Sequence, residues 1–295
     1  MKKKWKKKTK SLLWRASTRL GLHRPLLAKT GIILGLHRIA NCDGTPGLDY
    51  SPSDFKAICR FVKRHFTVLP LPVLAANVAS GNIRDRQLAI TFDDGYQDNA
   101  TIAAPILRSM GLPCTFFITS GFIGTKTIPW WDAQTGTHHP FMTWDHVREL
   151  HDQGFDIGGH TRTHMDLSQQ NEEQLYHEVV GCHQDITEAI GQAPVSFSYP
   201  FGQTDHITEA GLKMVQRAGF SSCSSLYGGL NRAGADPFSL ERIPVSHWYL
   251  SAHHMGGDLM VKALKARYTK PTPPKKKGGG GISCQPLLGM AQKSP

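Results

Sequence analysis

The sequence predicts an α/β protein whose parallel strands close into a barrel of about seven strands. Short apolar runs alternate with amphipathic segments along most of the chain, a pattern typical of repeated strand–helix units. About seven such units follow one another in one continuous stretch, and this number favours a barrel over an open sheet. At 295 residues the chain is long enough to bury the core of such a barrel.

The expected elements follow in order from residue 31. Strands are predicted at residues 31–36, 67–70, 87–94, 114–119, 155–159, 195–199, 221–225 and 242–245. Helices are predicted at residues 51–65, 71–80, 102–110, 143–153, 172–190, 207–218 and 257–266. Serine and proline open the first of these helices, and glycine follows several others, as helix boundaries require.

The two ends of the chain differ in composition from the body. Residues 1–24 hold ten basic residues and residues 262–295 hold eight, with no acid in either stretch. All 23 acids lie between them, so the body is acidic although the whole chain has a net charge of +11. We therefore expect a basic arm (1–24), a catalytic domain (25–266) and a low-complexity, disordered tail (267–295). A nucleic-acid-binding face is not expected on an acidic body.

The basic arm allows two interpretations. Lysine-rich segments are usually disordered and solvated, which is the simpler interpretation. However, Leu12, Ala16 and Leu20 would share one face of a helix, and tryptophans are interleaved with the lysines. The alternative is thus a helix that lies on anionic lipid, with its lysines on the phosphates.

Several observations concern the compartment. The six cysteines are scattered and form no metal or disulfide pattern, which is typical of reduced thiols. No apolar stretch approaches the roughly eighteen residues of a membrane span. The basic start is followed by too short an apolar run for a secretory signal. We expect a cytoplasmic protein, with the arm as its only contact with the inner membrane face.

Two short motifs carry the chemistry. Residues 91–95 (TFDDG) end a strand with two adjacent aspartates, and residues 160–164 (HTRTH) place two histidines four positions apart. Adjacent carboxylates repel one another and resist burial, unless one binds a cation while the other does chemistry. Histidines at this spacing lie on one face of a helical turn and can chelate one ion. Asp94, His160 and His164 are therefore the predicted ligands of a divalent metal, with zinc as the expected ion.

These motifs resemble those of the NodB-like polysaccharide deacetylase family. TFDDG and HTRTH are similar to its first two motifs, and residues 199–202 (YPFG) are similar to part of its third. The resemblance covers about residues 31–250. It implies a deformed β/α barrel, a divalent metal and removal of acetyl groups from an N-acetylated glycan. It also implies that Asp93 is the catalytic base and that the backbone N–H of Phe201 helps to hold the oxyanion.

The sequence departs from the family in two places. The arginine that opens the third motif, and that orients the catalytic aspartate, is replaced by Ser198. The late leucine–x–histidine motif that supplies the general acid is not recognisable. His247, after the last predicted strand, and His37, after the first, are the two candidates for this role.

Substrate contacts are assigned to residues near the predicted strand ends: Tyr199, Trp131 and Trp248. Tryptophan faces pack on sugar rings, although a loop tryptophan can equally anchor its loop in the core. Two other functions stay open. One is hydrolysis of a different linear amide on the same scaffold. The other is glycan binding without catalysis, if the missing arginine and histidine have abolished activity. The oligomeric state is not predicted.

Overall fold

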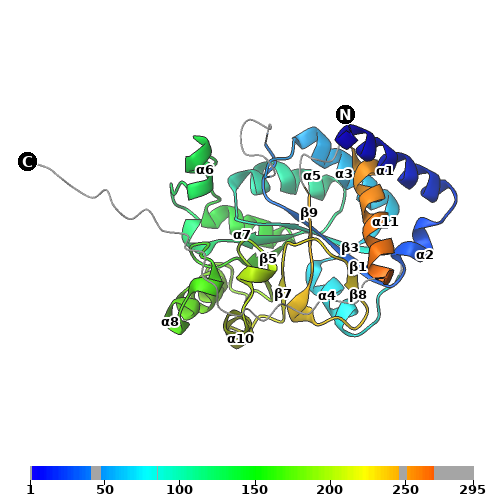
Figure 1. The fold of residues 1–295 in the computed structure, drawn as a ribbon. Coiled ribbons are helices and arrows are strands. Elements are labelled where there is room, and N and C mark those ends of the chain that lie inside the picture. The colour runs from blue at the N-terminus through cyan, green and yellow to red at the C-terminus, as the bar shows by residue number, and fades with distance from the viewer. Residues whose placement is uncertain (1, 41–47, 85, 246–250, 269–295) are drawn as a thin grey trace, which may run out of the picture.

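The computed structural model describes residues 2–40, 48–84, 86–245 and 251–268. The predicted C-terminal tail, apart from its first two residues, and the candidates His247 and Trp248 lie outside these described residues. Within them, parallel strands form a curled sheet with helices around it (Figure 1). The strands are β1 (Thr30–Leu36), β2 (Thr67–Val68), β3 (Gln87–Phe92), β4 (Thr115–Ile118), β5 (Asp156–Gly159), β6 (Ser196–Ser198), β7 (Ser222–Ser224), β8 (Asn231–Arg232) and β9 (Ile243–Pro244).

Seven of these strands form a ring. β7, β6, β5, β4, β3 and β1 are neighbours in that order, and each pair is parallel. β9 pairs in parallel with β1, and Leu240, just before β9, bridges to Ser224 in β7. The ring therefore closes through a short segment and a single bridge. This confirms the predicted deformed barrel of about seven strands, with β2 and β8 as short additions.

The helices include the seven predicted ones, close to their expected positions, and two short ones that were not predicted, at residues 23–27 and 130–135. They are α1 (Lys2–Arg19), α2 (His23–Leu27), α3 (Pro52–His65), α4 (Leu71–Ala79), α5 (Ala104–Ser109), α6 (Trp130–Thr135), α7 (Trp144–Asp152), α8 (Glu172–Leu175), α9 (Gly181–Ile190), α10 (Glu209–Arg217) and α11 (Ala252–Tyr268). Local capping explains the boundaries: Ser51 accepts the backbone N–H of Asp54, and Thr143 forms a capping box with His146. Two π-helical segments, Asn99–Ala103 and Tyr176–Val180, precede α5 and α9.

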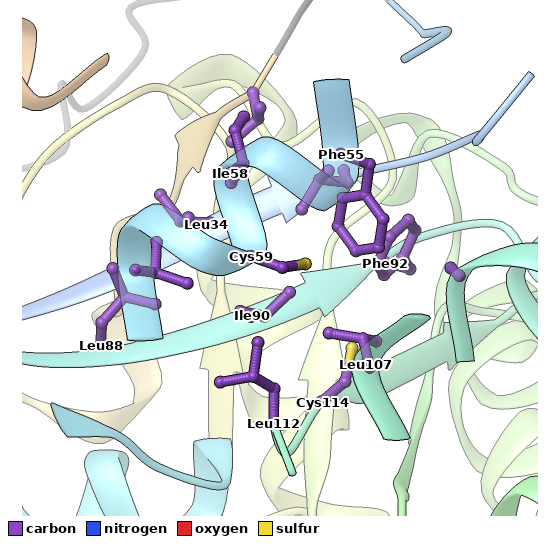
Figure 2. Packing of buried hydrophobic residues seen from close by; sticks show 14 of the residues in the cluster. Leu34, Phe55, Ile58, Cys59, Leu88, Ile90, Phe92, Leu107, Leu112 and Cys114 are labelled. Carbon is purple, nitrogen blue, oxygen red and sulfur yellow. The ribbon is translucent and has the colours of Figure 1, made fainter. Parts of the chain in front are cut away.

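The main hydrophobic core lies between the sheet and the helices on one of its faces. α3 and α5 pack their apolar side chains onto β1, β3 and β4, as Figure 2 shows for Phe55, Ile58 and Cys59 over Ile90 and Phe92. The rings of Phe55 and Phe92 meet edge to face, with centroids 5.4 Å apart. This packing fixes β3, and with it the aspartates that follow β3.

The basic arm is a helix that packs on the body, so the simpler interpretation of a disordered, solvated arm is wrong. Trp14 is fully buried, and its ring lies 5.3 Å from that of Phe61 in α3. Gly256 and Gly257 in α11 leave room for α1, because a Cβ at Gly256 would lie 2.5 Å from the Trp14 ring. Lys10 also pairs with Asp258 of α11. None of the described helices is both long and apolar enough to cross a membrane.

Candidate functional site

The C-terminal ends of four parallel strands place the candidate residues at one edge of the barrel. Residues 93–94 follow β3, His160 follows β5 and residues 199–202 follow β6. His37 follows β1, which pairs with β3 in register along its length. Barrel enzymes carry their active sites at this edge, because loops of many different strands meet there.

Asp94, His160 and His164 form a group that fits one metal ion. Asp94 Oδ1 lies 3.4 Å from His160 Nε2 and 3.5 Å from His164 Nε2. Two ligands that are each about 2.1 Å from a tetrahedral ion lie about 3.4 Å apart, so this spacing suits a shared divalent cation. Asp94 Oδ1 is buried and has no hydrogen-bond partner among the described residues. A cation at this point would satisfy an anionic oxygen that is otherwise costly to bury.

The histidine pair lies in a loop and not on a helical turn, which corrects the sequence prediction. β5 ends at Gly159, and residues 160–166 contain no helix. Thr161 and His164 instead have left-handed backbones, with φ of 66° and 59°. These two turns bring the imidazole rings to a centroid distance of 5.0 Å. The two histidines are therefore brought together by a loop, and not by the helical turn that their four-residue spacing suggested.

Two acids, of which Glu178 is buried and Asp185 is partly exposed, hold this loop in place. Arg162 forms a bidentate pair with Asp185, at 2.6 and 2.8 Å. Glu178 accepts both the backbone N–H and the hydroxyl of Thr163, at 2.8 and 2.6 Å. These contacts tie the segment between the two histidines to the helices that follow it.

Backbone strain concentrates at the same place. Six non-glycine residues among those described have a positive φ, and four of them are Asp94, Thr161, His164 and Phe201. Such conformations cost about 1 kcal/mol or more per residue and persist where surrounding contacts enforce them, commonly at functional sites. Their gathering at one edge of the barrel independently marks the site.

The hydrogen bond of His160 and the lowered pKa of His164 suit metal binding, whereas Asp93 and Asp94 raise the pKa of His160. His160 Nδ1 lies 2.7 Å from the backbone oxygen of Ser198, which can only accept, so Nδ1 carries the proton and Nε2 is free to bind. Burial lowers the pKa of His164 to about 4, so His164 is neutral near pH 7. Burial opposes ionisation of Asp94, but the imidazoles of His160, His37 and His164 hold the pKa of its carboxyl well below the usual value.

Asp93 is held by an arginine that the sequence analysis did not assign to the site. Arg242, immediately before β9, donates from both terminal nitrogens to the two carboxylate oxygens of Asp93, each at 2.7 Å. Both side chains are fully buried. Burial raises the pKa of Asp93, but the positive charges of Arg242 and His160 outweigh this and lower it below the usual value.

Arg242 occupies the place left by the substitution at Ser198. Its second terminal nitrogen also donates to the Ser198 hydroxyl at 2.6 Å, and its first donates to the Thr91 hydroxyl at 3.0 Å. Its Nε donates to the backbone oxygen of Ser225 at 2.8 Å. All five donors of the guanidinium are thus satisfied. The signal in the sequence was a lone arginine inside a predicted apolar strand, since a buried arginine requires a carboxylate.

Of the two proton-donor candidates, the structure describes only His37. Its imidazole is near enough to lower the pKa of Asp93, Asp94 and His164. The side chain of Asn99, in the π-helical segment, donates to the His37 backbone oxygen at 2.8 Å and fixes the end of β1.

The predicted substrate residues have different environments. The Trp131 ring lies 4.7 Å from that of His164, and its Nε1 donates to the Tyr96 hydroxyl at 2.7 Å, so Trp131 forms part of the wall of the site. Its neighbour Trp130 is 56% exposed. Tyr199 is not brought into the site, because its side chain is buried in the cluster that contains Phe197.

Phe201 lies next to the metal group. Its ring centroid is 5.0 Å from that of His164. The backbone N–H of Phe201 makes no hydrogen bond with the described residues, whereas the next N–H, of Gly202, donates to the oxygen of Pro200. The left-handed turn at Phe201 thus leaves this donor unused at the edge of the site.

Comparisons with known proteins agree with this geometry. The Polysaccharide deacetylase family model matches residues 80–221. YxkH of Bacillus subtilis, named a putative polysaccharide deacetylase, is 27% identical over 162 residues, which are 55% of this chain and 52% of YxkH. PdaA of Bacillus subtilis, named a peptidoglycan-N-acetylmuramic acid deacetylase, is 23% identical over 143 residues, which are 48% of this chain and 47% of PdaA. The matches span about half the length of these relatives.

Solved structures extend the likeness of the fold. The Streptococcus pyogenes deacetylase PplD, in complex with acetate, superposes with a TM-score of 0.63 at 19% identity, covering 77% of this chain and 96% of PplD. IcaB from Ammonifex degensii superposes with a TM-score of 0.64 at 21% identity, covering 77% of this chain and 97% of IcaB. The deformed barrel is common to all three. Residues 80–221, which carry both the aspartate and the histidine motif, thus match the model of the polysaccharide deacetylase family.

Proposed function

We propose that this protein is a metal-dependent hydrolase that removes N-acetyl groups from the sugars of a polysaccharide or glycan precursor. The observation that carries the proposal is the juxtaposition of two unlike aspartates. Asp94 has an unpartnered oxygen facing two imidazole nitrogens, whereas Asp93 is held by a fully satisfied arginine. One carboxylate is thus arranged to bind a cation, and its neighbour is arranged to handle a proton.

Asp94, His160 and His164 would hold the metal, and their two imidazoles and one carboxylate favour zinc. When bound, a divalent ion acidifies a water molecule and polarises a carbonyl oxygen. The family model supports a deacetylase, and the spacing of the donor atoms supports an ion shared by all three side chains.

The other residues handle protons and charge. Asp93, kept ionised by Arg242, accepts a proton from the attacking water. The unused N–H of Phe201 donates to the oxygen on which negative charge develops. His37, in its protonated form, gives a proton to the leaving amine, so that water and amide become acetate and a free amine. The pairing of Asp93 with Arg242 favours catalysis over a purely glycan-binding role, because a binding site has no need for an oriented base.

The exposed Trp130 is the best placed side chain for stacking on a sugar ring. It adjoins Trp131, whose own ring is engaged with His164 and Tyr96. An exposed aromatic face beside the metal group suits a glycan better than a short aliphatic amide. This wall and the match to the family together support a glycan as the proposed substrate class.

The proposal is tested by measuring metal content and acetate release together. Purified protein is analysed for bound metal and then incubated with N-acetylglucosamine oligomers. We expect about one divalent ion per chain, and acetate and free amine released in equal amounts. Metal without acetate release from any N-acetylated glycan would favour another amide substrate. Glycan binding without bound metal and without acetate release would favour a non-catalytic protein.

We also propose that α1 contacts an anionic membrane. With Trp14 packed inward, the opposite face of α1 exposes Trp5 and Leu12, at 74% and 64%, and Leu20, directly after the helix, is 71% exposed. Successive residues of a helix are rotated by about 100° around its axis, which places Lys6 on one side of this apolar stripe and Lys8 on the other. An apolar stripe between lysines is suited to the headgroup region of a membrane. Deletion of 1–24 would also remove core packing, so the test is Leu12→Ser with Leu20→Ser, which should weaken binding to anionic vesicles.

A further inference from the structure

A cavity of about 770 Å³ lies between α1, α3 and the start of α11, away from the candidate active site. None of the described residues assigned to catalysis or metal binding lines it. Its walls combine apolar side chains, such as Phe61, with several cationic ones. Two observations show that its chemistry favours an anion.

The first observation is unbalanced charge. Arg19, Arg60 and Arg64 line the cavity, and none forms an ion pair with a described residue. Asp54 is the acid among the lining residues, and its carboxylate accepts the hydroxyl of Ser51 at 2.7 Å at the start of α3. Three guanidiniums without carboxylate partners around one cavity constitute a site for a multiply charged oxyanion, since arginine binds phosphate through paired N–H groups.

The second observation concerns the histidines in the wall. Burial and the nearby charges of His23 and Arg64 lower the pKa of His65 to about 4. Burial, Arg15 and Arg64 likewise lower the pKa of His253. The Nδ1 atom of His253 is also buried and has no hydrogen-bond partner among the described residues. Burial is the largest cause of both shifts, so the observation that bears on a ligand is the unpartnered ring nitrogen, which in its N–H tautomer could donate to an anion bound beside the arginines.

The position of the cavity identifies the source of the anion. Thr18 and Arg19 line the cavity from the last turn of α1, and Leu20 of the exposed stripe follows directly. Arg19 therefore adjoins the surface that would meet a membrane, and Arg60 and Arg64 line the same cavity. Ala57, Phe61 and Ala252 give the cavity an apolar part that could take the first carbons of a lipid.

We propose that this cavity binds the phosphate group of an anionic membrane lipid, while the stripe on α1 lies in the adjoining headgroup layer. The inference rests on the proposed membrane contact of α1 but not on deacetylation, and its test needs no turnover. A second site of this kind would hold the barrel in a fixed orientation on the membrane, in addition to the general attraction of the lysines.

The test compares phosphatidylcholine vesicles that contain either phosphatidate or phosphatidylserine at equal surface charge. The full chain, with its metal, should prefer phosphatidate, whose terminal phosphate is accessible. Arg60→Gln with Arg64→Gln should weaken binding to phosphatidate vesicles by about tenfold or more and abolish the preference, since two charge-assisted contacts are lost. The matched control, Arg108→Gln with Arg232→Gln, removes the same charge from exposed arginines outside the cavity and should change binding less than about twofold.

The outcomes separate this inference from its premise. If the intact protein binds anionic vesicles but both double variants behave alike, the cavity is not the lipid site and the membrane contact of α1 stands. If neither vesicle type binds, both proposals fail, whatever the result for acetate release. A second arm titrates inorganic phosphate and follows the NMR signals of His65 and His253. If free phosphate saturates the cavity and vesicle binding is the same in the wild type and in the Arg60→Gln, Arg64→Gln variant, the assignment to a lipid is overturned.

Discussion

Arg242 and Asp93 are 149 positions apart in the sequence and form a fully buried, bidentate ion pair, with both N–O distances at 2.7 Å. This pair explains how Asp93 is oriented although residue 198 is a serine and not the arginine of the family motif. The guanidinium that the third motif of the family would provide from β6 comes instead from the segment that enters β9. Because the Ser198 hydroxyl also accepts from Arg242, the serine is complementary to the relocated arginine.

The first prediction follows from this relocation. Arg242→Ser leaves a buried carboxylate unpaired, so we expect a loss of about 3–5 kcal/mol in the free energy of unfolding and a loss of turnover. The double variant Ser198→Arg with Arg242→Ser should recover part of both. The milder Arg242→Lys keeps the charge but loses the paired geometry.

Steady-state kinetics as a function of pH provide the measurement. Arg242 lowers the pKa of Asp93, so Arg242→Lys should move the acidic limb of kcat/KM to higher pH and lower kcat more than it changes KM. Wild-type kinetics in this variant would show that the arginine serves only the core.

The second prediction concerns the metal ligands. His160→Ala and His164→Ala should each lose bound metal, whereas the exposed His138→Ala should retain it. Because a ligand that binds only the folded state stabilises it, zinc in hundredfold excess over its Kd should add about 2.7 kcal/mol to the stability of the wild type. Elemental analysis and thermal unfolding with and without zinc measure both effects. A wild type that neither carries metal nor responds to zinc would contradict the site.

How much of this site the sequence predicted depends on distance along the chain. The aspartates and histidines lie in two short motifs that each end a strand, so their residue types and strand order sufficed to bring them together. Arg242 was missed because its role depends on a partner far away in the sequence. The same is true of Trp14, whose burial depends on α11 and which was read only as part of a charged arm.

Local geometry was harder to predict than the pairing of elements. The histidine spacing suggested a helical turn, but the left-handed backbones of Thr161 and His164 could not be anticipated, because a non-glycine residue rarely adopts that conformation and a β-branched threonine does so least readily. Tyr199 was expected to contact the substrate, but its side chain lies in the core. Side chains alternate along an extended segment, and a shift of one position decides whether a residue faces the site or the core.

The third prediction separates the two aspartates. Asp93→Asn should retain near-wild-type metal content but lose turnover by a factor of about 10² to 10⁴, the usual contribution of a general base. Asp94→Asn should bind metal much more weakly, because it removes a charged ligand. Metal content by elemental analysis and acetate release are measured on the same preparations. Equal metal loss in both variants would show that the two roles are wrongly divided.

The fourth prediction concerns the proton donor. His37→Gln should lower kcat and remove the alkaline limb of the pH–rate profile, because the donor must be protonated to act. Metal content should stay unchanged, which distinguishes this variant from those of the ligands. His138→Gln is the control for a histidine substitution on the surface. An alkaline limb that persists in His37→Gln would transfer the assignment to His247.

The fifth prediction concerns Asp156, at the start of β5 and remote from the metal group. Burial raises the pKa of Asp156 to about 6, and the hydrogen bond from the Thr115 hydroxyl, at 2.8 Å, only partly offsets this. Between the unfolded pKa of about 3.9 and the folded value, the folded state keeps a proton that the unfolded state has lost. Stability from this group is therefore present below about pH 4 and is lost as the pH rises towards 6. Asp156→Asn resembles the protonated side chain, so it should match the wild type at pH 4 and exceed it at pH 7.5 by about 1–3 kcal/mol. Urea unfolding at the two pH values measures the difference, and a variant that is no more stable than the wild type at pH 7.5 would show that water reaches this carboxylate in the folded protein.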